Sequence, residues 1–319
     1  MVTVSRKAKQ FLVSAAKLLI VAGAFYFIAI RLSKEKIDWQ RLQDAASSDN
    51  AFLFITLIFL LTFLNRFFEI LKWKNLVSWL QTISLWQATS QVLAAVTAAI
   101  FTPNGIGEYA AKAVYYRKQQ AKDIIFLNLI CNGIQLIIAV LCGLAGLAVF
   151  NALYDVIPTT TLAIIIAGIA GVVLVVFLSR KITVKGYSLR RLFSKISDIP
   201  KTVHRKNMLL ALGRYLCIIH QHYLIFLAFG VDLPYGIMIC AIAGIYFLGS
   251  SVPNFQMVDF AVRGSVAVYF FGILGVNEWV VVLAATLQWL LNIVLPVAVG
   301  SYFVFRFRAM EPHPESPEG

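Results

Sequence analysis

The chain reads TPNGIGEYAAK at residues 102–112 and VPNFQMVDFAVR at residues 252–263. Each stretch follows a long apolar run, opens with a Pro-Asn pair, and continues to a carboxylate with a cation four residues beyond it. A bilayer tolerates non-helical backbone only where it is buried in protein or lines a watery cavity. Matching interruptions in two halves of a chain indicate a transporter-type binding site.

The composition is that of a polytopic membrane protein. Of the 319 residues, 60% are hydrophobic and 13% are charged. Residues 124–150 and 279–305 each run for 27 residues without Asp, Glu, Lys or Arg. As helices they would be about 40 Å long, which is enough to cross a bilayer with some tilt. The apolar run at 11–30 continues past a signal-peptide-like cleavage site, so we expect it to be a retained first span.

Cysteine usage and motif content indicate no cofactor. The four cysteines stand singly in apolar segments without CxxC spacing, so neither a disulfide framework nor a zinc site is predicted. No nucleotide-binding motif is present. We therefore expect no metal and no cofactor.

The distribution of charge predicts the orientation. The loop 180–206 carries nine lysines and arginines against one acid, Asp198, and such loops stay in the cytoplasm. The connectors 151–160 and 230–234 carry only one acid each and are expected outside. Both termini are then cytoplasmic, in an inner or plasma membrane. The net charge of +13 serves this topology and does not indicate a nucleic-acid partner.

The predicted fold class is an all-α polytopic membrane protein with two re-entrant hairpins. Six full spans are expected at about 11–30, 51–71, 123–150, 161–179, 208–229 and 278–305. Segments 82–116 and 235–273 must then each return to the side they left, and they enter from opposite sides. This is an inverted repeat, in which simple hydropathy would count about eight helices. Eight ordinary spans with two helix-breaking prolines stay open as an alternative.

The predicted domain organisation is simple. A single membrane domain covers residues 1–310, with half-repeats at about 51–150 and 208–306. The polar, proline-rich tail at 311–319 is expected to be disordered.

Each hairpin carries an acid and a base at mid-membrane. Glu108 and Lys112 are four residues apart with the acid first, which favours a helical ion pair, and Asp259 and Arg263 repeat the arrangement. An ionised side chain at this depth costs about 2.5–3.5 kcal/mol to insert, so such groups pair or line a cavity. Pairs that brace the hairpins without a ligand remain the structural alternative.

The backbone at each break is also a candidate for binding. A short helix behind Pro103 and another behind Pro253 would direct free N–H groups at an anion. Gly105 and Gly107 would permit close backbone approach, whereas the second element has no glycine there and is predicted to bind less closely or to act as a gate. The predicted substrate-binding residues are Pro103, Asn104, Gly105, Gly107, Glu108, Lys112, Pro253, Asn254, Asp259, Arg263 and Arg66.

Further charges stand at the predicted ends of spans. Arg66 and Glu69 are three residues apart and can pair, and Arg66 is assigned either to the cavity or to a helix-end anchor. Lys72 and Trp73 are predicted to mark the interface by snorkelling and aromatic anchoring, and Arg214 is predicted to be an anchor. In addition, residues 188–199 follow helical spacing with a basic face, which predicts an amphipathic helix on the inner leaflet.

A known family resembles this chain. Its TPNGIGE motif at 102–108, the Lys72-Trp73 step and the Pro253…Asp259 element are similar to the membrane region of bacterial lysylphosphatidylglycerol synthases, which also occurs alone in proteins described as flippase-like. The resemblance covers about residues 10–306. The soluble aminoacyl-transferring domain is absent from this sequence, which argues against transferase activity. The resemblance implies movement of a lipid or lipid-linked group between leaflets, with Glu108 and Asp259 as functional positions.

The first functional hypothesis is therefore a non-enzymatic translocase for an anionic or amphiphilic membrane lipid. The alternatives are a secondary transporter that couples a small solute to protons, and a non-catalytic scaffold for an envelope enzyme. An intramembrane transferase is weaker, because no donor-binding motif or activated nucleophile accompanies Glu108. Membrane lipids are the expected partners; a homo-oligomer and an envelope-enzyme partner both stay open.

Overall fold

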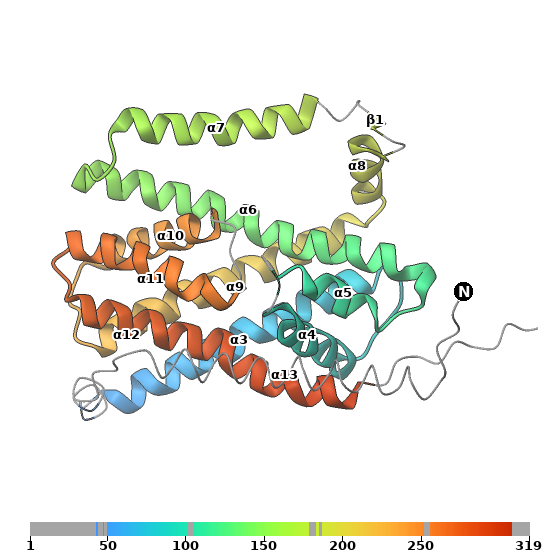
Figure 1. Cartoon of the computed structure of the whole chain (residues 1–319), viewed down its shortest axis with the longest axis horizontal. Coiled ribbons are helices and arrows are strands. Elements are labelled where there is room, and N and C mark those ends of the chain that lie inside the picture. The colour runs from blue at the N-terminus through green and yellow to red at the C-terminus, as the bar shows by residue number, and fades with distance from the viewer. Residues whose placement is uncertain are drawn as a thin grey trace, which may run out of the picture.

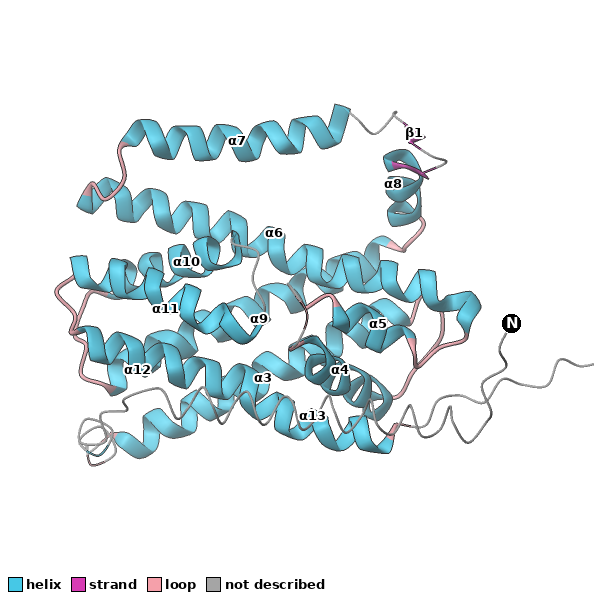
Figure 2. Cartoon of the chain, in the orientation of Figure 1, coloured by secondary structure: helices cyan, strands magenta, loops and turns pink. Residues whose placement is uncertain are grey.

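The computed structural model describes residues 50–100, 102, 105–178, 183–184, 187–251 and 256–307, with single residues at 43 and 47. Within these ranges the chain forms helices joined by turns and loops, with one short pair of strands (Figure 1, Figure 2). The elements are α3 (Ala51–Val77), α4 (Leu85–Ala99), α5 (Gly107–Ala113), the 3₁₀ turn η1 (Lys118–Gln120), α6 (Ala121–Tyr154), α7 (Thr159–Leu178), β1 (Thr183–Val184), β2 (Tyr187–Ser188), α8 (Leu189–Ser197), α9 (Lys201–Ala228), α10 (Tyr235–Ser251), α11 (Gln256–Ile273), α12 (Glu278–Trp289), the π-helix η3 (Leu290–Val294) and α13 (Leu295–Arg306).

Four of these segments are long and apolar enough to cross a membrane. They are Ala51–Val77, Lys118–Tyr154, Lys201–Ala228 and Glu278–Arg306. They correspond to four of the six predicted spans, and α7 corresponds to a fifth. The predicted span at 11–30 and the tail at 311–319 lie outside the described residues. The all-α polytopic membrane fold is thus confirmed.

Two helical hairpins enter the bundle from opposite ends. The chain turns back between α4 and α5 and again between α10 and α11, and Figure 1 shows the two hairpins pointing toward the middle of the molecule from its two ends. Helix α4 has 15 residues and α5 has seven, which is too short for either to cross a hydrocarbon core of about 30 Å. The first hairpin is therefore re-entrant, as predicted, and the alternative of eight ordinary spans is wrong for this segment.

The two halves exchange their hairpin arms. Helix α4 of the first half packs against α13 of the second, and α10 of the second packs against α6 of the first. Small residues allow both contacts. A Cβ added at Gly300 would lie 2.2 Å from the Leu93 carbonyl oxygen of α4, and one added at Gly143 of α6 would lie 2.2 Å from the Cβ of Phe247 of α10. One arm of each hairpin therefore packs against a long helix of the other half.

Apolar side chains form two large clusters, and the second draws residues from both halves. The first gathers Trp73, Leu76, Val92 and Leu127 near the first hairpin, and the second surrounds Phe226 and the other buried residues of α9, α10 and α12. Helices α3 and α9 pack along each other between these clusters. Polar side chains of the two helices meet along this seam, where Arg214 contacts Glu69 and Gln221 donates to Thr62.

Side-chain caps begin two of the helices near the site. The Ser84 hydroxyl accepts from the Gln87 N–H at 3.1 Å while the Gln87 side chain accepts from the Ser84 N–H at 2.8 Å, a capping box that begins α4. The Asn277 side chain accepts from the Trp279 N–H at 3.0 Å and begins α12. Both caps occupy donors that the first helical turn leaves unpaired.

The predicted helix at 188–199 is present as α8, and part of its apolar face packs against the bundle. Leu192 and Ile196 pack against the first apolar cluster. Lys195 pairs with Asp123 of α6 and lies 4.7 Å from the centre of the Phe126 ring. These contacts hold α8 against the bundle. Packing Leu192 and Ile196 against protein is favourable because it removes their apolar area from water.

Candidate functional site

The structure describes six of the eleven predicted site residues in full. They are Gly105, Gly107, Glu108, Lys112, Arg66 and Arg263. Asp259 lies in α11, but its side chain is not among those described. Pro103, Asn104, Pro253 and Asn254 lie outside the described residues.

The predicted ion pair of the first hairpin is present. Lys112 Nζ donates to Glu108 Oε1 at 2.5 Å and to Asn128 Oδ1 of α6 at 2.8 Å. The ammonium also lies 4.4 Å from the centre of the Trp73 ring. The Lys112 side chain is 0% exposed and that of Glu108 is 14% exposed. A buried ammonium needs such partners, because an uncompensated charge in the interior is costly.

The backbone at the start of α5 differs from our expectation. Gly105 has φ of +68°, a conformation that glycine adopts without strain. The Gly107 N–H donates to the Thr102 hydroxyl at 2.8 Å, and the Glu108 N–H donates to the Gly105 carbonyl at 3.0 Å. The N–H groups of Gly107 and Glu108 are thus already used within the turn. The close approach at Gly107 is also internal, since an added Cβ would lie 2.8 Å from the Ala98 carbonyl oxygen of α4.

Lys72 and Trp73 are buried, so their assignment to the interface is wrong. The Lys72 side chain is 0% exposed, and Nζ donates to Gln135 Oε1 of α6 at 3.1 Å. The Trp73 Nε1 donates to Gln91 Oε1 of α4 at 2.6 Å. The sequence signal that could have found them is the helical spacing of polar residues along α3 at 62, 65, 69 and 72, which forms one inward stripe.

Glu69 pairs across helices and not along its own. Its Oε2 lies 2.6 Å from Arg214 Nη1 of α9. Arg214 Nε also donates to Asn65 Oδ1 at 3.1 Å. The predicted Arg66–Glu69 pair is replaced by this contact, and Arg214, which sequence reasoning took for an anchor, belongs to the site.

Arg66 binds the backbone of the second half. Its Nη2 donates to the carbonyl oxygen of Asn292 at 2.8 Å. The usual donor to that carbonyl would be the N–H four residues later, and proline at 296 has none. Asn292 lies in the π-helix η3, a distortion that is frequent at functional sites. The Asn292 side chain accepts from Asn65 Nδ2 at 2.5 Å, so this turn is joined to α3 by two hydrogen bonds.

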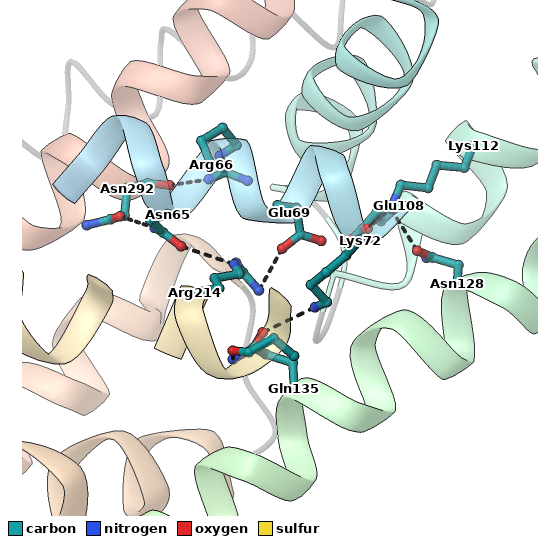
Figure 3. A network of polar contacts seen from close by, with 11 residues as sticks. Asn65, Arg66, Glu69, Lys72, Glu108, Lys112, Asn128, Gln135, Arg214 and Asn292 are labelled. Atoms are coloured by element: carbon teal, nitrogen blue, oxygen red, sulfur yellow. Dashed lines mark hydrogen bonds and ion pairs between the residues drawn. The ribbon is translucent and has the colours of Figure 1, made fainter. Parts of the chain in front are cut away.

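The network carries an excess of positive charge. Figure 3 shows its side chains converging on the inner face of α3. Among the described residues, four cations of this network (Arg66, Lys72, Lys112 and Arg214) face two carboxylates (Glu69 and Glu108), which is an excess of two. Within the described part of the chain, the hydrogen bonds of Arg66 and Lys72 go to neutral oxygens. The Nε of Arg66 and the Nδ2 of Asn128 are buried donors that have no hydrogen-bond partner among the described residues.

The sequence model of the lysylphosphatidylglycerol synthase TM region matches residues 14–300. The chain belongs to this family. A comparison with curated proteins found no match. Family membership makes the chain a multi-pass membrane protein related to lipid modification or lipid flipping.

In the second hairpin, the structure describes the surroundings of Arg263 but not the side chain of Asp259. Arg263 of α11 lies with its Cζ 4.8 Å from the centre of the Tyr246 ring of α10. Gly249 of α10 makes room for it, since an added Cβ would lie 2.5 Å from Arg263 Cγ. The cations Lys112 and Arg263 of the two hairpins thus each lie over an aromatic ring.

The described residues offer hydrogen-bond donors and acceptors to a polar ligand. No group of three or more His, Cys, Asp or Glu side chains among them could hold a metal ion. The chemistry available to the network is therefore hydrogen bonding and charge pairing. Among the described residues, the network atoms with neither a hydrogen bond nor an ion pair are the donors Arg66 Nε and Asn128 Nδ2, which suits an acceptor-rich anion such as a phosphate.

Proposed function

We propose that this protein translocates a phosphate-bearing anionic lipid between leaflets, without catalysing a covalent reaction. The observation that carries the proposal is the excess of two positive charges among the described side chains of this network. Lys72 is fully buried, and within the described part of the chain its hydrogen bond and that of Arg66 go to neutral oxygens. An anionic head group would supply the missing counter-charge.

The energetics favour an anion at this place. Each cation at mid-membrane costs about 2.5–3.5 kcal/mol to insert on translocon scales, and pairing lowers that cost. Glu108 and Glu69 already hold Lys112 and Arg214. The remaining charge therefore makes the network select for a ligand that carries negative charge, and it disfavours a cationic one.

The hairpins supply a route for exchange between the two sides. The α4–α5 hairpin enters from one end of the bundle and the α10–α11 hairpin from the other. Alternate movement of the two would open the network first to one leaflet and then to the other, as in transporters with inverted repeats. Movement would then follow a gradient, a partner or passive equilibration.

Location and orientation form part of the proposal. We place the protein in the inner or plasma membrane with both termini in the cytoplasm. The loop 180–206, with its nine cations, supports this orientation because cytoplasmic loops are enriched in Lys and Arg. Membrane lipids are the proposed partners.

The test is a leaflet-resolved assay in liposomes with a fluorescent anionic lipid. Wild-type protein should move the lipid faster than protein-free vesicles do, and Glu108→Gln and Lys72→Met should each slow it about tenfold. Lys74→Met, on the same helix but outside the network, is the matched control and should stay within about twofold of wild type. Equal rates for wild type, Glu108→Gln and protein-free vesicles would refute the proposal.

One observation keeps the proton-coupled transporter as a second candidate. The Glu108 carboxylate is 14% exposed, so it is the acid of the network most accessible to solvent or solute. Solute uptake that follows an imposed pH gradient, without lipid movement, would favour this function. Loss of an envelope enzyme's activity on deletion, but not in Glu108→Gln, would instead identify a scaffold.

A further inference from the structure

The span Glu278–Arg306 contains an interruption near its middle. It consists of α12, the π-helix η3 and α13. The Leu295 N–H donates to the carbonyl of Leu290, five residues back, where an α-helix would bond four residues back. Pro296 follows directly. It has no N–H, and in a regular helix its ring would clash with the Asn292 carbonyl. The hydrogen-bond ladder of this span is therefore broken at the π-turn.

The two parts of the span hold arms of different hairpins. Helix α12 packs against α11 of the second hairpin, and α13 packs against α4 of the first. The Thr97 hydroxyl of α4 donates to the Val297 carbonyl of α13 at 3.2 Å. Figure 1 shows α11 beside α12 toward one end of the molecule and α4 beside α13 toward the other. A change of angle at the π-turn would therefore move α11 relative to α4.

Side chains of α3 and α9 hold the π-turn in place. Arg66 Nη2 donates to the Asn292 carbonyl at 2.8 Å. The Asn292 side chain accepts from Asn65 Nδ2 at 2.5 Å and donates to Gln221 Oε1 of α9 at 2.8 Å. Proline is tolerated in a membrane helix where neighbouring groups bind the carbonyl that it leaves unpaired. Arg66 is such a neighbour, so the turn is fastened to α3 while the helices on either side of it remain separate.

We propose that this π-turn is the hinge about which the two hairpins alternate, and that Pro296 is a positioning residue for that movement. The proposal rests on the proposed function. Sharp helix kinks occur at prolines and at π-bulges, and this turn has both. Pro296 acts by leaving the Asn292 carbonyl to Arg66, which holds the hinge point while α12 and α13 change their angle. An anion bound at Arg66 would share the guanidinium with the hinge, so ligand and hinge meet at one side chain.

The test restores the missing donor with Pro296→Ala, so that the residue 296 N–H can bond the Asn292 carbonyl. Spin labels at Leu85 of α4 and Tyr269 of α11, both exposed, measure the separation of the two arms in liposomes. The labels are attached in a background whose four cysteines are replaced by alanine. Wild type should show more than one separation, and Pro296→Ala should show one. Val299→Ala, at an exposed position of α13, is the control and should keep the wild-type distribution.

A second label pair gives an internal reference. Tyr269 and Trp279 lie on α11 and α12, on the same side of the π-turn, and both are exposed. This pair should show one separation in wild type and in both variants. A spread of Tyr269–Trp279 separations equal to that of the arms would overturn the hinge, because the movement would then not be centred on the π-turn.

Movement of the fluorescent anionic lipid is measured in the same liposomes. Pro296→Ala should slow it about tenfold, and Val299→Ala should stay within about twofold of wild type. Slow movement in Pro296→Ala with the wild-type spread of arm separations would overturn the inference, since the proline would then act only on the ligand site. A single arm separation in wild type would also overturn it, and lipid movement above background would in that case leave the proposed function standing. Several separations that Pro296→Ala reduces to one, without lipid movement in wild type, would support the hinge and refute the proposed function.

The wild-type chain offers an independent measurement that needs no substitution. Amide hydrogen exchange along residues 278–306 should be slow in α12 and α13 and faster at 290–296, because a hinge opens locally more often than the helices beside it. Uniformly slow exchange through 290–296 would overturn the inference.

Discussion

Replacing Glu69 by Gln should destabilise the protein far more than replacing an acid on its surface. The Glu69 carboxylate lies 2.6 Å from Arg214, and their side chains are 6% and 19% exposed. Removing one partner of a buried ion pair costs about 3–5 kcal/mol, because the other charge is left uncompensated. The change also raises the excess of positive charge among the described residues of the network from two to three.

The expected fall in apparent melting temperature is about 6 to 15 °C, taking about 2 to 3 °C per kcal/mol for a chain of this size. The assay is intrinsic fluorescence of the detergent-solubilised protein at one fixed scan rate, because membrane proteins commonly unfold irreversibly. Glu278→Gln, at the exposed start of α12, is the control and should shift the melting temperature by about 2 °C or less.

A double variant tests the reasoning further. Glu69→Gln with Arg214→Gln removes one charge of each sign, so the excess returns to two. The double variant should therefore melt above Glu69→Gln alone, and the two effects should be strongly non-additive. A melting temperature of Glu69→Gln within about 2 °C of wild type, or simple additivity in the double variant, would contradict the charge balance described for this network.

Two further predictions concern the packing of the helices. Gly143→Ala should lower the free energy of unfolding by about 1–3 kcal/mol, because it overpacks the α6–α10 contact. Gly133→Ala on the same helix has nothing within 4 Å of its added Cβ and should be neutral or stabilising. Equal melting temperatures of the two variants would contradict the close approach at Gly143. Lys195→Ala or Asp123→Asn should release α8 and raise its amide hydrogen exchange, with a change in stability of about 1 kcal/mol or less because the pair is half-exposed. Unchanged exchange would show that apolar contacts alone hold α8.

The sequence predicted the features that depend on residues close together in the chain and that occur in both halves. The Pro-Asn breaks and the charge spacing stand within a dozen residues of each other in both halves, so the hairpins and the Glu108–Lys112 pair followed from local rules. The same rules placed two spans too narrowly. Helix α3 continues to Val77 and α9 begins at Lys201, so Lys72 and Arg214 lie well inside their helices and not near the ends.

Long-range partners could not be predicted from spacing. Arg66 was near enough in sequence to pair with Glu69, but the packing of α3 on α9 brings Arg214 to that carboxylate. The bond from Arg66 to the Asn292 carbonyl spans 226 residues. It depends on a π-helix whose origin, a proline four residues after Asn292, is visible in the sequence only once the partner is known.

The exchange of hairpin arms has a consequence for biogenesis. Helix α4 contacts α13 through residues 200 positions apart, as in the hydrogen bond from the Thr97 hydroxyl to the Val297 carbonyl. A ribosome adds about 5–20 residues per second, so the nascent α4 waits about 10 to 40 seconds for its permanent neighbour. During that interval insertion machinery or lipid must shelter its inner face, and maturation can finish only after the last helix leaves the ribosome.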